Sequence, residues 1–316
     1  MASRLTVVMY HYVRDLERSP FPRIKGLTLE KFRGQLAYLA RHYTFVRIEE
    51  VLAALRGEAR DFPQRAVLLT FDDGYSDHYR HVYPLLDARG IQGCFFPPVG
   101  ALRGGAVLDV NKIQFSLAAC EDVGEIAAHC LKRIEELHGE YDLEPPAHYL
   151  AAYAHATRMD DAQTIFVKRL LQRGLPEAAR ARIAAEIFRR FVTADEAAFA
   201  EELYLTPAQV RAMRRAGMYF GAHGVTHRWL DSLDEPGQRE EISGSRELLT
   251  ELGYGEGERV ISYPSGGFND ITLKVVREAG FSAGFTVEVR VAEMGREAPL
   301  TIPRLDTVDL PYQENG

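Results

Sequence analysis

The stretch Val67–Tyr75 reads VLLTFDDGY, and the rest of the chain is best interpreted outward from it. Its apolar first half is typical of a buried strand, which ends at the adjacent carboxylates Asp72 and Asp73 before Gly74 lets the chain turn away. In parallel α/β proteins the carboxyl ends of strands carry the chemistry. Two neighbouring carboxylates repel each other, so their placement together indicates that they bind something, with a metal ion as the obvious candidate.

A second polar strand end lies far downstream. The apolar segment Met218–Phe220 leads into the sequence GAHGVTH, which places His223 and His227 four residues apart. One aspartate and two histidines are a suitable set of three protein ligands for a zinc-like ion that keeps an open position for water. The other aspartate is then available as a base.

The composition sets limits on the class of protein. The chain has 316 residues, 46% of them hydrophobic, and a net charge of −7, which argues against a general affinity for nucleic acid. No segment approaches the roughly 18 continuous apolar residues of a membrane span, and the apolar patch near Met1 is too short for a signal peptide. Cys94, Cys120 and Cys130 are an odd number without metal-type spacing, so we expect reduced thiols and a cytoplasmic protein. The sequence does not indicate an oligomeric state.

Strand-like and helix-like patterns alternate along most of the chain. Strands are predicted at Thr6–His11, Ala66–Phe71, Cys94–Val99, Met218–His223, Arg259–Pro264, Phe281–Val287 and Leu300–Leu305. Amphipathic helices are predicted at Leu29–His42, Ile48–Arg56, His78–Ala88, Glu235–Leu252 and Ile271–Ala279. This alternation predicts an α/β protein with a parallel sheet or barrel.

The alternation is interrupted between about residues 103 and 205. This segment is rich in Ala, Glu, Arg and Leu, with helical patterns at Val123–Leu137, Ala162–Gln172 and Glu177–Phe191. We interpret it as a helical insertion in a strand-to-helix loop of one barrel domain that spans residues 1–316. The insertion either shapes a substrate site, as helical lids in such loops do, or provides extra packing or an oligomer surface.

Polar and special residues gather at the predicted strand ends. They are His11, Asp72, Asp73, Pro97, His223, His227, Pro264 and Arg304. Core residues would not cluster at one end of the strands, so this set predicts a functional site there.

These motifs resemble a known family. Thr70–Gly74 (TFDDG) resembles the first signature of the polysaccharide deacetylases (NodB-homology, carbohydrate esterase family 4), and His223–His227 is similar to their His-x-x-x-His signature. Ser262–Gly266 (SYPSG) resembles the Tyr-Pro-x-Gly variant of the third motif, and Tyr10-His11 resembles members acting on surface polysaccharides. The resemblance covers roughly residues 5–102 and 206–306 and leaves the insertion out.

The resemblance implies a distorted (β/α)7-type barrel, NodB-like, and a metal-dependent N-deacetylase. By this resemblance Asp73, His223 and His227 would bind one divalent transition metal ion, usually zinc, with Fe²⁺, Co²⁺ and Ni²⁺ as alternatives. Asp72 would act as the base for a metal-bound water. A backbone N–H, that of Tyr75, would stabilise the oxyanion.

Two departures from the family pattern stand out. Many members carry an arginine in the third motif that orients the base, and Ser262 takes that position here. Arg304 could supply the missing guanidinium to Asp72, although a structural ion pair is the ordinary alternative. Many members also use a histidine near the C-terminus as general acid, yet no histidine follows His227. His11 is the best substitute, with a structural histidine or a substrate contact as the alternative.

Four further residues are candidates for substrate contact. Tyr75 and Pro264 lie just past strand ends, Trp229 follows the second histidine, and Asn111 is in the segment that opens the insertion. Tyr75 fits ordinary packing equally well, and Trp229 fits a cover over the barrel rim.

The leading hypothesis is a hydrolase that removes an N-acetyl or N-formyl group from an amino sugar. The sugar would be nucleotide-linked, lipid-linked or part of a growing glycan, in bacterial surface polysaccharide, lipopolysaccharide or O-antigen biosynthesis. One alternative is hydrolysis of a non-sugar amide on the same fold. Another is a non-catalytic carbohydrate-binding protein, which the missing histidine and the displaced arginine would favour.

Overall fold

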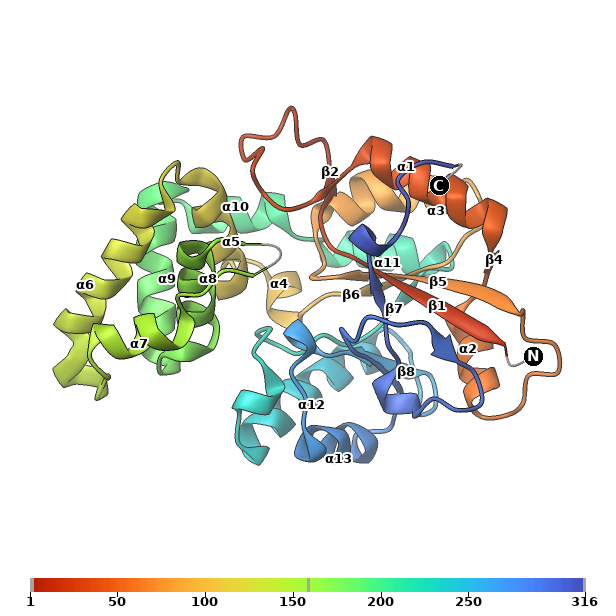
Figure 1. Ribbon diagram of the computed structural model, residues 1–316. Helices are drawn as coiled ribbons and strands as arrows, with labels where there is room; N and C mark the ends of the chain where they lie inside the picture. The colour runs from red at the N-terminus through yellow and green to blue at the C-terminus, as the bar shows by residue number, and fades with distance from the viewer. Residues whose placement is uncertain (1–2, 158–159, 315–316) are drawn as a thin grey trace. The chain divides into compact units, whose positions relative to one another are not determined.

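A computed structural model describes residues 3–157 and 160–314 (Figure 1). The chain forms two compact units. The first consists of the described residues of Met1–Asp15, Gly26–Gly104 and Glu201–Gly316, and the second of those of Leu16–Lys25 and Gly105–Ala200. The segment predicted to be an insertion therefore lies almost wholly in the second unit, which also takes in residues 16–25.

The first unit contains a ring of strands. The strands of this unit are β1 (Arg4–Tyr10), β2 (Val13–Arg14), β3 (Leu27–Thr28), β4 (Thr44–Phe45), β5 (Arg65–Asp72), β6 (Gly93–Phe96), β7 (Tyr219–Phe220), β8 (Arg259–Ser262), β9 (Phe281–Phe285), β10 (Ala292–Glu293) and β11 (Leu305–Asp306). β2 and β3 form a separate two-stranded sheet beside the ring. β1, β5, β6 and β7 are consecutive parallel neighbours. A parallel bridge between Ala222 and Ile261 leads on to β8 and its parallel partner β9, and a bridge between Phe285 and Ile302 leads towards β11, which pairs with β1.

The sheet thus closes on itself, and the predicted distorted barrel is confirmed. Alternate residues of each strand face opposite sides. Leu68 packs in the barrel interior with Phe96 and Phe285, whereas Val67, Leu69 and Phe71 pack beneath the surrounding helices. Because Asp72 is in the alternating series of Leu68, its carboxylate is directed into the barrel.

Helices cover the outside of the ring. They are α1 (Leu29–His42), α2 (Ile48–Leu55), α3 (Tyr83–Asp87), α4 (Val99–Arg103), α11 (Pro207–Arg215), α12 (Glu235–Glu251) and α13 (Asp270–Glu278). Figure 1 shows α12 and α13 side by side. Capping follows the sequence: the side chain of Thr206 accepts from Gln209 N at the start of α11, and that of Asn269 accepts from Thr272 N at the start of α13.

Several predicted elements differ in part from the structure, among them the following two. The helix expected at His78–Ala88 begins as the π-helix η1 (His78–Val82) before α3. The strand expected at Leu300–Leu305 was wrong in its first half, where Pro299–Thr301 is a short 3₁₀ helix (η5), because Pro299 fixes a helical backbone angle at its start. Further short helices are η3 (Leu230–Ser232), η4 (Pro264–Gly266) and η6 (Thr307–Asp309).

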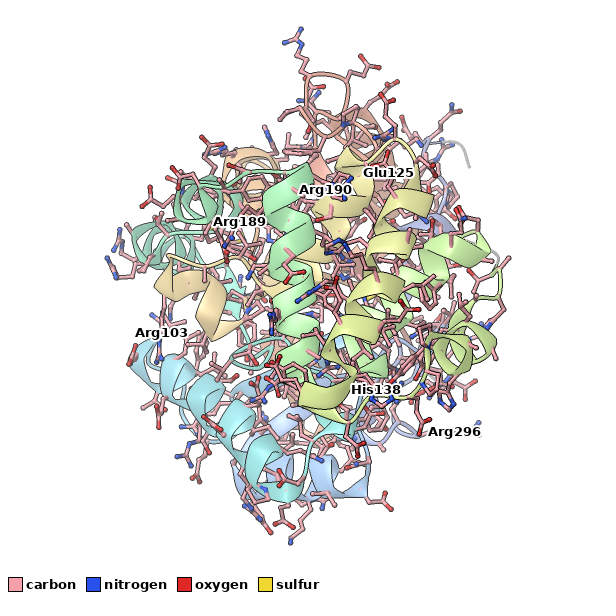
Figure 2. The ribbon with its side chains drawn as sticks, turned by 90° about the vertical axis from the view of Figure 1, so that its left-hand side faces the viewer. Arg103, Glu125, His138, Arg189, Arg190 and Arg296 are labelled. Atoms are coloured by element: carbon pink, nitrogen blue, oxygen red, sulfur yellow. The ribbon has the colours of Figure 1, made fainter. Side chains whose placement is uncertain are left out.

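The second unit is helical. It contains α5 (Asp109–Ala119), α6 (Val123–Tyr141), α7 (Pro146–Tyr153), α8 (Ala162–Arg169), η2 (Leu170–Gly174), α9 (Glu177–Phe191) and most of α10 (Glu196–Leu203). Figure 2 shows α6 and α9 side by side, with an ion pair of 3.0 Å between Glu125 and Arg190. Their facing sides share an apolar core that includes Ile134 and Ile187. No helix among the described residues is long and apolar enough to cross a membrane.

Candidate metal centre

The turn after β5 presents the aspartate pair at the carboxyl end of the barrel. Asp73 has a left-handed backbone (φ 72°), and Gly74 follows with φ 68°. The N–H of Asp73 donates to Phe96 O at 3.1 Å, which fixes the turn against β6. A Cβ on Gly74 would lie 2.5 Å from Cβ of Pro97, so only glycine fits there. The carboxylates of Asp72 and Asp73 consequently diverge into different surroundings.

The segment after β7 brings the two histidines to the same place. His223 is buried, and its Nδ1 lies 2.7 Å from the carbonyl oxygen of Ser262. A carbonyl only accepts, so Nδ1 carries the hydrogen and the lone pair of a neutral imidazole is on Nε2. Gly224 and His227 both have left-handed backbones (φ 73° and 61°). Such a conformation is uncommon for histidine and is typical of functional sites that the surrounding structure holds in place.

Asp73, His223 and His227 form a group that could hold a metal ion. Asp73 Oδ1 lies 3.4 Å from Nε2 of His223 and 3.1 Å from Nε2 of His227. Zinc ligands at about 2.0–2.2 Å from a tetrahedral ion lie roughly 3.3 Å from one another, so these separations suit a shared cation. Among the described residues no hydrogen bond of ordinary geometry ends on Asp73 Oδ1, although the atom is buried. Because Nδ1 of His223 donates to a carbonyl, an Nε2 without a hydrogen and this oxygen would face each other as two acceptors, an arrangement that needs a proton or a cation between them.

The electrostatics of the group favour a negative carboxylate with positive charge beside it. Burial alone would raise the pKa of Asp73, but the charge of His227 and the contacts with both imidazoles hold it well below its usual range. Burial alone would lower the pKa of His227, yet the carboxylate of Asp73 outweighs burial and raises it. The donor set therefore fits a divalent transition ion, with two imidazoles and one carboxylate as ligands.

Asp72 has a different partner. The fully buried guanidinium of Arg304 contacts the carboxylate of Asp72 twice, with Nη1 at 3.0 Å from Oδ1 and Nη2 at 2.8 Å from Oδ2. The hydroxyl of Ser262 also donates to Oδ2, at 3.1 Å. Burial opposes ionisation of Asp72, but the charges of Arg304 and His223 outweigh it and lower the pKa of this carboxyl. Asp72 is thus held as an ionised, oriented carboxylate beside the metal-ligand group.

Tyr75 supports Asp73 from within the protein. Its ring is fully buried and stacks on Tyr12 with 3.9 Å between ring centroids. Its hydroxyl donates to Asp73 Oδ2 at 2.6 Å, which leaves Oδ1 facing the imidazoles. Burial first, and then the charge of Asp73, raise the pKa of Tyr75 well above its usual range, so the hydroxyl remains a donor.

The sequence also matches a family model, described as polysaccharide deacetylase, over residues 59–105 and 179–284. These ranges include the aspartate pair, both histidines and Ser262. The chain belongs to the polysaccharide deacetylase family. The resemblance inferred from the motifs is confirmed.

Curated relatives match the chain over short stretches. It is 35% identical over 82 residues to the poly-beta-1,6-N-acetyl-D-glucosamine N-deacetylase of Escherichia coli strain K12, which covers 26% of this chain and 12% of that enzyme. It is 31% identical over 85 residues to the YxkH protein of Bacillus subtilis, which covers 27% of this chain and 30% of that protein. The chain thus spans less than a third of the length of these curated relatives.

Solved structures match nearly the whole chain. The deacetylase PplD of Streptococcus pyogenes, solved with acetate, superposes with a TM-score of 0.59 at 18% identity over 97% of this chain and 93% of its own. IcaB of Ammonifex degensii superposes with a TM-score of 0.57 at 20% identity over 96% of this chain and 91% of its own. At these identities the match establishes the fold.

The other residues predicted from the sequence lie in different settings. His11 follows β1, is partly exposed, and is close enough to help lower the pKa of both Asp72 and Asp73. Pro264 is buried and opens the turn η4, and partly buried Trp229 packs against the backbone of residue 267, where a Cβ would lie 3.2 Å from the indole. Asn111 is fully buried in α5 of the helical unit and donates to Gln114. The substrate contacts of Tyr75, Pro264, Trp229 and Asn111 stay predictions.

Sequence reasoning missed two contributors to this site. Ser262 was noted only as the residue in place of an arginine, whereas its hydroxyl and its carbonyl contact Asp72 and His223. Glu241 was not considered at all, although it is buried on α12 and bonded to the segment between the histidines. The one available signal was its position beside Ile242 on the buried face of that helix, where an unpaired carboxylate would be costly.

Proposed function

We propose that this protein is a hydrolase that removes an N-acetyl group from an amino sugar, with N-formyl as the alternative acyl group. The observation that carries the proposal is the side-by-side placement of two differently held carboxylates. Asp73 Oδ1 lies 3.4 Å from Nε2 of His223 and 3.1 Å from Nε2 of His227. Asp72 is ionised and forms an ion pair with Arg304. This arrangement separates a metal ligand from a base within one turn of the chain.

A divalent ion held by Asp73, His223 and His227, for which zinc is our first choice, would polarise the amide carbonyl and make water more acidic. The protein's own residues carry the proton. Asp72, ionised by Arg304 and oriented by Ser262, takes a proton from the attacking water. We assign the backbone N–H of Tyr75 to the developing oxyanion.

We assign protonation of the leaving amine to His11. Its position beyond the carboxyl end of β1, near both aspartates, supports this role. A general acid matters most when the leaving amine is poor. His11→Gln should therefore slow hydrolysis of a natural acetamido sugar by about 10²-fold or more, while an activated anilide should lose much less. Equal slowing of both substrates would refute the assignment.

The name of the Escherichia coli relative supports an acetamido sugar in a surface polysaccharide as the substrate class. We extend this to nucleotide-linked and lipid-linked sugars and to the O-chains of lipopolysaccharide, which present the same amide. The cysteines Cys94, Cys120 and Cys130 are free and buried, which is compatible with a reducing compartment, and we propose a cytoplasmic reaction.

The test measures metal content and acetate release together. Wild-type protein should bind about one divalent transition ion per chain and release acetate from acetamido sugars, and His223→Ala/His227→Ala should lose both. Asp72→Asn should keep the ion and lose activity by about 10²–10⁴-fold, because only the base is removed. Wild-type protein that binds no ion after incubation with zinc, or Asp72→Asn with wild-type rates, would overturn the proposal.

A further inference from the structure

The carboxylate of Glu241 is buried, with 1% of the residue exposed, on the face of α12 that packs on the barrel. A buried carboxylate is costly unless hydrogen bonds satisfy it. Every hydrogen bond described for its side-chain oxygens comes from residues 225–228. Oε2 accepts the N–H groups of Val225 at 2.7 Å and Thr226 at 3.0 Å. Oε1 accepts the Thr226 hydroxyl at 2.5 Å and the guanidinium of Arg228 at 3.0 and 3.2 Å.

Residues 225–228 belong to the segment that carries both histidines, which we call the His loop (residues 222–228). The first part of the loop is also tied to α4, since Val99 N and Gly100 N donate to the carbonyls of Gly224 and Val225. The later part must hold His227 in a left-handed conformation with φ 61°. Such a conformation is costly for a residue other than glycine and persists only where its neighbours fix it. Glu241 binds residues on both sides of His227, namely Thr226 and Arg228.

The approach of helix and loop is close. A Cβ on Gly224 would lie 2.7 Å from Glu241 Oε2, so the glycine at this position makes room for the carboxylate. The side chains of Gln238 and Ser245 lie one turn away on the same buried face. Gln238 donates to Leu233 O and accepts from the Thr272 hydroxyl, and Ser245 donates to Glu241 O, so the bonds described for them do not involve the loop. Glu241 therefore differs from its buried neighbours in being committed to the His loop.

We propose that Glu241 is a positioning residue that sets the place of the His227 imidazole and thereby the metal affinity of the site. The inference rests on the proposed metal centre. Residues that orient metal ligands usually affect affinity by about 10–100-fold. Without the carboxylate the N–H groups of Val225 and Thr226 lose their acceptor, and His227 is free to leave the left-handed region.

The first test compares zinc affinity in Glu241→Ala, Glu241→Gln and the control Ser245→Ala, by competition with a chromophoric chelator. Glu241→Ala should weaken zinc binding by about 10–100-fold. Glu241→Gln keeps one acceptor oxygen and should lose less, and Ser245→Ala should bind as wild type. Equal zinc affinity in wild type and Glu241→Ala would overturn the inference while leaving the metal centre intact. Absence of zinc binding in wild type would instead overturn the proposed function.

The second test needs no metal. Amide hydrogen exchange of metal-free protein should show faster exchange at residues 225–228 in Glu241→Ala, with unchanged protection in β5 and β6. Should Glu241→Ala fail to fold, Thr226→Val removes the hydroxyl partner from the solvent side of the contact. Introduced alone, Thr226→Val should weaken zinc binding. Combined with Glu241→Gln, it should weaken zinc binding little further than Glu241→Gln does by itself. Independent, additive effects of the two substitutions would refute a shared contact that positions His227.

Discussion

The turn that carries the aspartates and the loop that carries the histidines are held in place by different kinds of contact. In the Asp loop (residues 72–75) and in the His loop, a proposed metal ligand has a left-handed backbone, with φ 72° at Asp73 and 61° at His227. The Asp loop is fixed by main-chain bonds, from Asp73 N to Phe96 O at 3.1 Å and from Leu205 N to Gly74 O at 2.8 Å. The first part of the His loop also has main-chain bonds, to α4, but Thr226 and Arg228 on either side of His227 are bound by the side chain of Glu241. A left-handed residue can thus be held mainly by main-chain bonds or mainly by one buried carboxylate.

The difference has a consequence for mutation. Main-chain bonds survive the exchange of a side chain, so the Asp loop should keep its shape when its side-chain contacts are altered. The His loop should be the more sensitive half of the site, because one substitution removes several of its bonds. Changes on the Asp side should therefore affect stability, charge and rate more than they affect the position of the metal ligands.

The largest expected effect on the Asp side comes from Arg304→Met. The guanidinium and the carboxylate of Asp72 are both nearly fully buried, and loss of one partner of a buried pair costs about 3–5 kcal/mol. We expect the free energy of unfolding to fall by about that amount at neutral pH in chemical denaturation. Zinc affinity should change little, since Asp73 keeps its main-chain bonds. Loss of zinc binding in folded Arg304→Met would show that the Asp loop, like the His loop, depends on side-chain contacts.

The same variant has a pH signature. In wild type the pKa of Asp72 is lowered, so the carboxyl contributes stability above its unfolded pKa of about 3.9 and loses that contribution as the pH falls through its folded pKa. In Arg304→Met, burial acts without the guanidinium and raises the pKa. The difference in the free energy of unfolding between wild type and Arg304→Met should therefore decrease as the pH falls. In the pH profile of kcat/KM, the loss of activity on the acidic side should occur at higher pH in Arg304→Met than in wild type. Arg304→Lys, which keeps the positive charge, is the control, and its pH profile of kcat/KM should shift less.

The sequence was sufficient for the residues that local motifs define. Asp72, Asp73, His223 and His227 stand in short signatures at strand ends, and a parallel barrel brings strand ends together whatever the loops do. Arg304 was predicted from the same rule, at the end of the strand expected at Leu300–Leu305, although the structure places it directly before β11. The structure then places its guanidinium 2.8 Å from Asp72.

The rest required the folded structure. The contact of Glu241 with Thr226 joins residues of α12 and the His loop through packing that no local pattern encodes. The hydroxyl of Tyr75 reaches back to Asp73 because the turn between them is left-handed. The sequence predicted a substrate contact, ordinary packing or an oxyanion N–H for Tyr75, but no bond to Asp73. Residues 16–25 join the helical unit by long-range contacts, such as that of Arg23 with Ala118 O, which composition does not reveal.

The smallest expected effect sharpens the comparison at Tyr75. Tyr75→Phe removes the hydroxyl that donates to Asp73 Oδ2 and leaves the ring stacked on Tyr12. A hydrogen bond to a charged group contributes about 1.5–3 kcal/mol, so the variant should be destabilised by up to that amount. Zinc affinity should fall by about 10-fold at most, less than in Glu241→Ala, since the main chain still fixes Asp73.

The matched control is Tyr263→Phe. Tyr263 is also fully buried, and its hydroxyl donates to Leu300 O at 2.8 Å, within the same unit but not to a metal ligand. Chelator competition should show wild-type zinc affinity for Tyr263→Phe and a modest loss for Tyr75→Phe, while thermal unfolding shows a loss of stability in both. If Tyr75→Phe weakens zinc binding as much as Glu241→Ala does, the Asp loop also depends on a side chain, and the distinction between the two loops is lost.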